Sequence, residues 1–297
     1  MRAVDAPLPA SLRKPSRLGL AAAVVTVALL LGGCAPGRPQ GSRGALFWLI
    51  AAGAVPRLLA VPGAASAVTA ALDSPRTVVI GSPPRAIRSW HVRWARSATS
   101  LQGVSSVLRQ AGGERLSAVV YDQEFWRFTP SPEQKDPAPY VRRAEVMAHR
   151  RGLQLIATPA VDLVRAVGKP AHGTVYETFL RLGIARQVSR FADVFEIQAQ
   201  GAEADVQRYQ SFVEGAATQA REANPRVVLV AGLSTNPTGQ EVTAAELEAD
   251  VAATRRIVSG YWLNVPSGGA YCPTCGAPQP QVGARLLESL YGRAGRR

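Results

Sequence analysis

From residue 77 onward, short runs of β-branched and other apolar residues alternate with longer segments in which apolar residues recur every three or four positions. The short runs predict strands, and the longer segments predict amphipathic helices. The expected strands cover residues 77–80, 89–94, 116–122, 153–158, 194–200, 227–232 and 260–264. The expected helices cover residues 99–110, 138–150, 175–190, 205–223, 244–258 and 282–291.

This alternation predicts an α/β fold. The later strands are almost entirely apolar, which is typical of parallel strands covered on both faces. Seven strands over about 220 residues, with the apolar stretch 45–72 available to complete the set, favour a (β/α)8 TIM-like barrel. The alternative is an open, doubly wound parallel sheet, but no Gly-x-Gly-x-x-Gly follows an early strand to support a nucleotide site.

The N-terminal segment has the features of an export signal. An apolar run of about 14 residues ends in Leu31-Gly32-Gly33-Cys34 and follows four basic residues. The basic residues are typical of an export signal, and the run is shorter than the ~20 residues that a membrane-spanning helix needs. Its last four residues resemble the lipobox of bacterial lipoproteins. The resemblance implies cleavage before Cys34 and a diacylglyceryl group on its thiol, which would hold the protein at the outer face of the cell membrane. An ordinary signal peptide that contains a cysteine is the alternative.

Four segments follow from these patterns. Residues 1–33 are expected to be the signal peptide, and residues 34–44, rich in Pro and Gly, the lipidated tether. The apolar residues 45–74 are interrupted by Pro56 and Pro62, so we expect a helical segment packed on the barrel, with a membrane-lying segment as the alternative. Residues 75–297 are expected to form the barrel domain.

The net charge of +13 shows a strongly basic chain, and removal of residues 1–33 leaves it basic. A basic surface suits anionic headgroups, acidic wall polymers or nucleic acid. No basic cluster interleaves with aromatic residues as in an RNA-stacking face, and an exported lipoprotein seldom meets nucleic acid. We therefore expect a membrane partner and no nucleic-acid partner, and the oligomeric state stays open.

Two cysteines remain once Cys34 is assigned to the anchor. Cys272 and Cys275 form a Cys-Pro-Thr-Cys segment, and outside the cytoplasm such a pair is most simply a disulfide. A redox dithiol is less favoured, because Gly276, Pro278 and Pro280 keep the following chain irregular. A zinc site ranks last, since no histidines stand at ligand spacing. We expect neither a metal nor another cofactor.

Two carboxyls stand at the end of the strand expected over residues 116–122. Residues two apart in an extended segment share a face, so Asp122 and Glu124 would point to the same side. In a barrel, the carboxyl ends of the strands carry the active site. The alternative is that Asp122 caps the loop through backbone hydrogen bonds and that Glu124 is solvated or salt-bridged.

Further polar residues follow other strands. Glu196, Gln198 and Gln200 alternate with apolar residues and would share one face, where burial without partners costs roughly 1 to 3 kcal/mol each. That cost favours a hydrated pocket or a ligand, whereas an edge strand with this face in water is the alternative. Asn236 lies after the strand expected over 227–232, and Asn264 ends the strand expected over 260–264.

These residues would suit glycoside hydrolysis at one barrel mouth. Glu124 and Glu196 are the expected acid and nucleophile or base, and Asp122 would tune Glu124 by its charge. Trp126 and Trp262 would stack on sugar rings beside the substrate-binding Gln198, Gln200, Asn236 and Asn264, although each Trp alone is more often a core residue. The first hypothesis is a carbohydrate-active hydrolase. The rival is a non-catalytic ligand-binding or scaffold lipoprotein of the cell envelope.

The mature domain also resembles a group of exported actinobacterial proteins of unknown function. The residues that carry the resemblance are those of 121–126, Thr129-Pro130, Glu133-Gln134, Asp136-Pro137, Trp262-Leu263-Asn264 and Cys272-Pro273-Thr274-Cys275. The resemblance spans most of residues 75–290 and implies a shared glycosidase-like TIM-barrel fold. It implies no catalytic residue.

Overall fold

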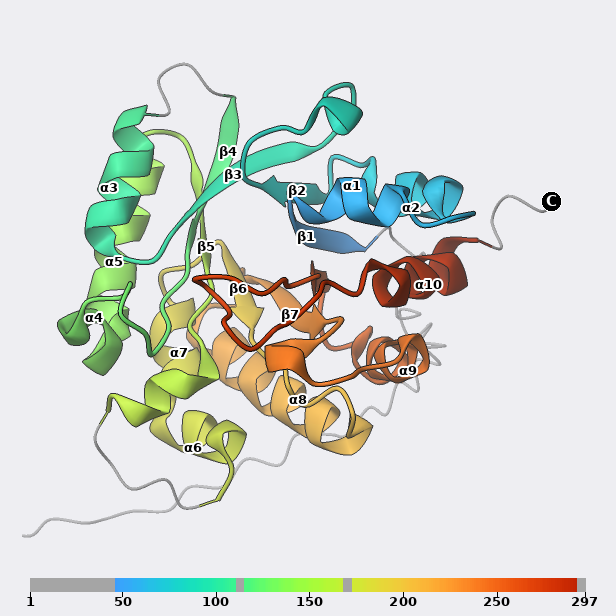
Figure 1. Ribbon diagram of the computed structural model, residues 1–297. Helices are drawn as coiled ribbons and strands as arrows, with labels where there is room; N and C mark the ends of the chain where they lie inside the picture. Colours follow the sequence, from blue (N-terminus) through green and yellow to red (C-terminus); the bar gives the residue numbers. More distant parts are fainter. Residues whose placement is uncertain (1–45, 111–114, 168–172, 293–297) are drawn as a thin grey trace, which may run out of the picture. The chain divides into compact units, whose positions relative to one another are not determined.

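Parallel strands close into a barrel in the computed structural model of the protein, which describes residues 46–110, 115–167 and 173–292. Each strand pairs with the next along the chain, and the last pairs with the first (Figure 1). The (β/α)8 barrel is therefore confirmed, and the open sheet is excluded. The strands are β1 (Phe47–Ala51), β2 (Thr77–Ile80), β3 (Arg93–Ala98), β4 (Leu116–Tyr121), β5 (Gln154–Ala157), β6 (Val194–Ile197), β7 (Val228–Ser234) and β8 (Gly260–Asn264).

Helices surround the barrel (Figure 1). Local signals mark several of their ends: Thr243 with Glu246 and Thr174 with Glu177 form capping boxes at two N-termini. The helices are α1 (Ala54–Leu59), α2 (Ala65–Leu72), α3 (Leu101–Gln110), α4 (Ser131–Lys135), α5 (Pro137–His149), α6 (Val175–Leu182), α7 (Ile184–Ser189), α8 (Val206–Ala223), α9 (Ala244–Thr254) and α10 (Pro280–Tyr291). Short 3-10 turns cover Arg85–Ile87, Val161–Arg165 and Pro237–Gly239.

Two apolar layers result from the alternation of side chains along the strands. One set fills the barrel interior, and the other packs between the barrel and the helices. At the amino ends of the strands, the Arg93 guanidinium donates to Gln154 Oε1 at 2.9 Å and lies 5.1 Å from the centre of the Phe47 ring. These side chains fill the end of the barrel opposite the carboxyl ends of the strands.

Barrel closure depends on a close approach between β1 and β8. The Phe47 backbone N–H donates to the Ser259 carbonyl at 3.1 Å, and Phe47 is in register with Gly260. A Cβ on Gly260 would lie 1.8 Å from the Phe47 carbonyl oxygen. Because no side chain fits in that space, glycine is required at the seam.

The segment 45–74 holds both a strand and helices. It was assigned as a helical segment packed on the barrel, with a contribution to the strands left open, and the structure shows both: Phe47–Ala51 form β1 of the barrel, and α1 and α2 follow. The compact unit accordingly begins at Ala45. Val55, Leu58, Val68 and Leu72 are fully buried, so α1 and α2 pack on the barrel rather than presenting an apolar face outward.

Three expected boundaries were wrong. The strand expected over residues 89–94 is instead β3, from Arg93 to Ala98, because a 3-10 turn occupies the chain before it and pairing with β2 and β4 fixes its place. The helix expected over 175–190 breaks at Gly183, whose φ of +67° ends α6. The strand expected over 194–200 stops at Ile197, where the Ala199 N–H turns back to the Ile197 carbonyl.

Among the described residues, no helix combines the length and apolar character that crossing a bilayer requires. Cys34 and the segments 1–33 and 34–44 lie outside the described residues.

Candidate active site

The carboxyl ends of the strands surround a cavity of about 830 Å³. This size is within the range of small-molecule sites, roughly 300 to 1,000 Å³. Its lining combines carboxyls, amides and aromatic rings that come from the ends of β4, β6 and β8 and from the segments after them. The polar and aromatic residues among them are Arg57, Ser97, Thr99, Asp122, Glu124, Trp126, Gln198, Gln200, Trp262, Asn264, Ser267 and Tyr271.

Asp122 and Glu124 both line this cavity, as the sequence predicts. The Asp122 backbone N–H donates to the Ala98 carbonyl at 2.8 Å and continues the pairing of β4 with β3 by one residue. The Thr158 hydroxyl donates to Asp122 Oδ1 at 2.8 Å. The Thr129 hydroxyl accepts the Glu124 backbone N–H at 3.2 Å, so backbone contacts hold both carboxyls at the mouth.

The two carboxyls differ in acidity. Burial raises the pKa of Asp122 to about 6, with the Thr158 hydrogen bond opposing the rise and the Asp162 charge adding to it. Burial also raises the pKa of Glu124 to about 9, and the charges of Asp122, Asp162 and Glu196 raise it further. At neutral pH the site therefore holds a protonated Glu124 beside a mostly ionised Asp122.

Glu196 lies in the same row of the barrel wall. Tyr121 is in register with Ala157, and Ala157 with Phe195, so the next residues on the three strands, Asp122, Thr158 and Glu196, stand side by side. Glu196 is fully buried, and neither carboxyl oxygen has a hydrogen-bond partner among the described residues. Burial first, and then the Asp122 charge, raise its pKa well above the ordinary value.

The structure brings Glu196 into one row with Asp122 but not onto the cavity surface, since Glu196 is not one of the described residues that line it. The sequence predicted Glu124 and Glu196 as the pair of carboxyls, and of these two Glu124 alone lines the cavity. The second carboxyl that lines the cavity is Asp122, where the sequence predicted Glu196.

The amide side chains divide between two places. Gln198, Gln200 and Asn264 line the cavity. Gln198 Oε1 accepts the Val161 backbone N–H at 3.2 Å, and Asn264 Nδ2 donates to Gln200 Oε1 at 3.4 Å. Asn236 instead is buried beneath the disulfide loop, where its Nδ2 donates to the carbonyls of Cys275 and Ala277. Its contacts are structural.

Aromatic rings gather at the mouth. Trp126 lies 5.8 Å from Tyr271 and 5.2 Å from Phe128, measured between ring centres, and Phe128 lies 5.0 Å from Tyr271. Tyr271 is 69% exposed, so this group presents ring surface to solvent. Trp262 lines the cavity from β8, and its buried Nε1–H has no acceptor among the described residues.

Cys272 and Cys275 form a disulfide, as the sequence predicts. The Cys272 N–H and the Gly269 N–H donate to each other's carbonyls at 3.2 Å, and Gly268 donates to the Gly276 carbonyl at 2.6 Å. These contacts fold the loop so that Tyr271 and Cys272 line the cavity. The pair is thus a structural element of the mouth.

Sequence reasoning missed Thr158, Asp162 and Arg57. Thr158 and Asp162 follow β5, and Asp162 Oδ1 accepts the Phe125 backbone N–H at 3.0 Å. Reading the end of β5 as the other strand ends were read would have found both. Arg57, in the last turn of α1, is the basic residue among the cavity's described lining. Among the described residues, no group of His, Cys, Asp and Glu has the spacing of a metal site.

No protein-family model and no curated protein matches this chain. Among solved structures, a chitinase from Chromobacterium violaceum ATCC 12472 is 12% identical, covers 82% of this chain and 99% of its own, and has a TM-score of 0.45. The spore cortex-lytic enzyme SleL of Bacillus megaterium QM B1551 is 9% identical over 82% of this chain and 73% of its own, with a TM-score of 0.49.

A sugar phosphate isomerase/epimerase from Parabacteroides distasonis ATCC 8503 has the same TM-score of 0.49, at 11% identity over 84% of this chain and 95% of its own. Such distant similarities carry no functional argument. The assignment of the fold rests on the strand pairing of the chain itself.

Proposed function

We propose that the barrel mouth hydrolyses glycosidic bonds. The observation that carries this proposal is the pair Asp122 and Glu124 at the end of β4, which line one cavity with Trp126 and Trp262. Glycoside hydrolysis needs a protonated carboxyl for the leaving oxygen and a carboxylate near the sugar carbon. Aromatic rings beside the two carboxyls supply surfaces on which sugar rings stack.

Glu124 is the proposed general acid. Its pKa of about 9 keeps it protonated at neutral pH, so it has a proton to give to the leaving oxygen. Asp122, with a pKa of about 6, is the proposed carboxylate that stabilises the oxocarbenium-like transition state. Behind them, burial and the Asp122 charge raise the pKa of Glu196 well above its ordinary value, which disfavours a further negative charge next to Asp122.

A second candidate function is ligand binding without turnover. The burial of Glu196 favours it, because one member of the expected catalytic pair does not reach the cavity surface. The amides and rings at the mouth would still bind a carbohydrate. Both functions are proposed for a protein at the outer face of the membrane, with polysaccharides of the cell envelope or the environment as ligands.

The test uses the chain from residue 35 to 297 with a panel of envelope polysaccharides, and measures newly formed reducing ends. We expect E124Q to lower kcat/KM at least about 100-fold, because general acid catalysis contributes roughly that much. D122N should also lower kcat/KM, because it removes the carboxylate that stabilises the transition state. E214Q, at an exposed carboxyl on α8, is the matched control and keeps full activity. Full turnover by E124Q would refute the hydrolase, and binding without turnover in the wild type would establish the second candidate.

We also propose that Cys34 carries the lipid anchor, on the support of the lipobox-like residues 31–34. Metabolic labelling with an alkyne fatty acid in a bacterial host tests this. The wild type and C272S should take up label and sediment with membranes, whereas C34S should do neither. Labelling of C34S would contradict the proposal.

A further inference from the structure

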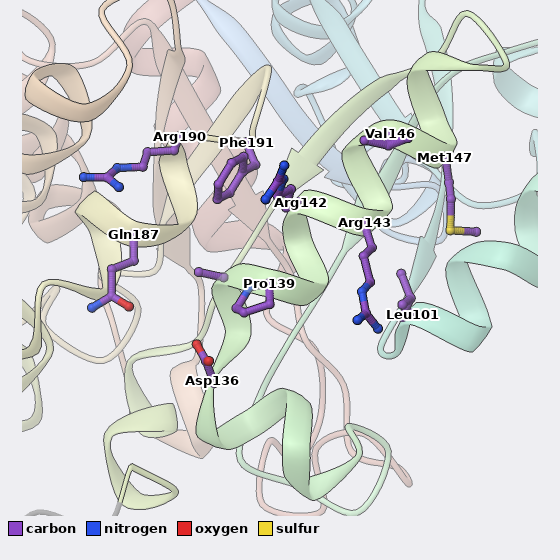
Figure 2. A pocket seen from close by; sticks show the side chains of 11 residues that line it. Leu101, Asp136, Pro139, Arg142, Arg143, Val146, Met147, Gln187, Arg190 and Phe191 are labelled. Carbon is purple, nitrogen blue, oxygen red and sulfur yellow. The ribbon is translucent and has the colours of Figure 1, made fainter.

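A second cavity, of about 750 Å³, lies in the helical layer and shares no described lining residue with the barrel mouth. Its floor is one face of α5, since its lining residues on that helix recur every three or four positions from Ala138 to Met147. Leu101 of α3 borders one side, and Gln187 of α7 with Arg190 and Phe191 borders the other (Figure 2). We call this cavity the α5 groove.

The α5 groove is rich in positive charge. Arg142, Arg143 and Arg190 line it, against one carboxylate, that of Asp136. Arg142 and Arg190 are exposed, and neither guanidinium makes a hydrogen bond or an ion pair with another described residue. Arg143 lies 5.7 Å from the ring centre of Tyr140. Figure 2 shows Arg142 between Phe191 and Arg143 in the row of lining side chains.

Apolar side chains form the rest of the lining. Val146 is 41% exposed, although it is a large apolar residue on a helix, and Leu101, Met147 and Phe191 are partly buried around it. An occupant that covers them must be apolar in one part and anionic in another. That is the chemistry of an amphiphile with a negatively charged head.

Two segments near the ends of this chain do not fit the groove. Residues 35–44 contain Arg38 and Arg43, and residues 293–297 contain three arginines and no acid, so either segment would be repelled by the groove's charge. An acidic peptide from another protein fits less well than a lipid. The helical walls have their backbone groups paired within α5 and α7, so a peptide would find few partners for its own N–H and C=O groups. An acyl chain has no such groups.

We propose that the α5 groove binds an anionic phospholipid, with Arg142 and Arg190 at the phosphate and the acyl chains against Val146, Met147 and Phe191. Guanidinium groups bind phosphate oxygens through paired hydrogen bonds. The proposal stands independently of the hydrolase and of the anchor at Cys34, because it concerns a different set of residues.

The experiment measures binding of the chain from residue 35 to 297, which retains the whole compact unit, to vesicles of phosphatidylcholine with and without phosphatidylglycerol. We expect binding only when phosphatidylglycerol is present. R142E and V146D should each weaken it at least about tenfold, because the first reverses a charge at the head group and the second places a charge against the acyl chains.

Matched controls separate the groove from general surface charge. R285E makes the same charge change on α10, and V206D replaces another exposed valine, 37% exposed, on α8. Both should bind like the wild type. Equal losses in R142E and R285E, or no preference for phosphatidylglycerol, would overturn the proposal. So would polyglutamate binding that R142E abolishes while vesicle binding persists, since this outcome would assign the groove to an acidic peptide.

Discussion

Glu196 on β6 occupies the space that a side chain on Gly232 of β7 would need: a Cβ at position 232 would lie 2.4 Å from Glu196 Oε1. The next contacts of such a Cβ, at 3.1 and 3.2 Å, are with Gln200 of the cavity lining. A glycine on one strand thus makes room for the buried carboxyl of its neighbour. The pair fixes how Glu196 sits in the row with Asp122 and Thr158.

We therefore expect G232A to destabilise the protein by about 1–3 kcal/mol, as overpacking of a core does. Urea denaturation measures the change. Combining G232A with E196A should cost less than the sum of the two single changes, because the carboxyl that the new methyl meets is gone. G53A is the control, since a Cβ there meets nothing within 4 Å. Strict additivity would show that Glu196 does not occupy this space.

The acidities of Asp122 and Glu124 give a second prediction. Carbon-detected NMR titration of the side-chain carboxyls should show Asp122 with a pKa of about 6 and Glu124 with a pKa of about 9. In D122N the pKa of Glu124 should fall, because the Asp122 charge contributes to its rise. A Glu124 pKa near the ordinary value of about 4.3 would contradict the burial on which the site depends.

The same two groups predict the pH dependence of any hydrolysis. Activity should rise with pH as Asp122 loses its proton near pH 6, and fall again as Glu124 loses its proton near pH 9. The profile of kcat/KM against pH measures this. Since D122N lowers the pKa of Glu124, any residual activity should show its alkaline limb at lower pH, whereas a purely structural role of Asp122 would leave that limb in place.

Asp250 on α9 does not line the candidate active site, and we expect it to affect the stability of the fold. Its side chain is fully buried, and neither carboxyl oxygen has a hydrogen-bond partner among the described residues. Burial first, then the charges of Glu203, Glu246 and Asp205, raise its pKa to about 8. The unfolded chain releases this proton near pH 4, so between about pH 4 and 8 the folded state binds more protons than the unfolded state.

The contribution of Asp250 to the free energy of unfolding should therefore fall as pH rises, by at most about 1.4 kcal/mol per pH unit. D250N cannot ionise, so its stability relative to the wild type should increase from pH 5 to pH 8. Denaturant unfolding across that range checks this, with E248Q on the same helix as the control. A pH-independent difference between D250N and the wild type would contradict the buried, neutral state of Asp250.

The disulfide gives the next prediction. Replacing both cysteines by serine should lower stability by about 2 kcal/mol, because the bond closes a loop of few residues. The larger effect is expected on carbohydrate binding, since the loop places Tyr271 beside Trp126 and Phe128. Y271A in the oxidised protein separates loss of the ring from loss of the constraint. If the serine variant binds like the wild type, the loop geometry does not shape the mouth.

The sequence was informative about the barrel because most of its strands are short and apolar and alternate with helices. Its boundaries failed where pairing outweighs local preference, as at β3, whose Arg-Trp-Ala-Arg-Ser-Ala lacks β-branched residues. The strand β1 was hidden in an apolar stretch that suits a helix as well as a strand. Only its pairing with both β2 and β8 distinguishes the two.

At the site, strand ends identified Asp122 and Glu124, because direction along a strand is readable from alternation. Alternation along a strand does not show how deeply a side chain is buried. Nothing in the pattern of residues 194–200 shows that Glu196 is enclosed while Gln198 and Gln200 reach the cavity, since the end of β6 and the glycine on the next strand decide it. Asn236 was misplaced for a related reason: its partners, Cys275 and Ala277, lie in a loop far along the chain.

The pairing of β1 with β8 at Phe47 and Gly260 also sets the order in which the strands of the barrel can pair during folding. The first strand of the barrel finds its second neighbour only when the last strand is present, so a chain that emerges from its N-terminal end must hold β1 with one edge unpaired until β8 follows. Such distant pairing is slow to form. A chain cut before residue 260 would keep two open edges, and we expect aggregation rather than a smaller barrel to be its fate.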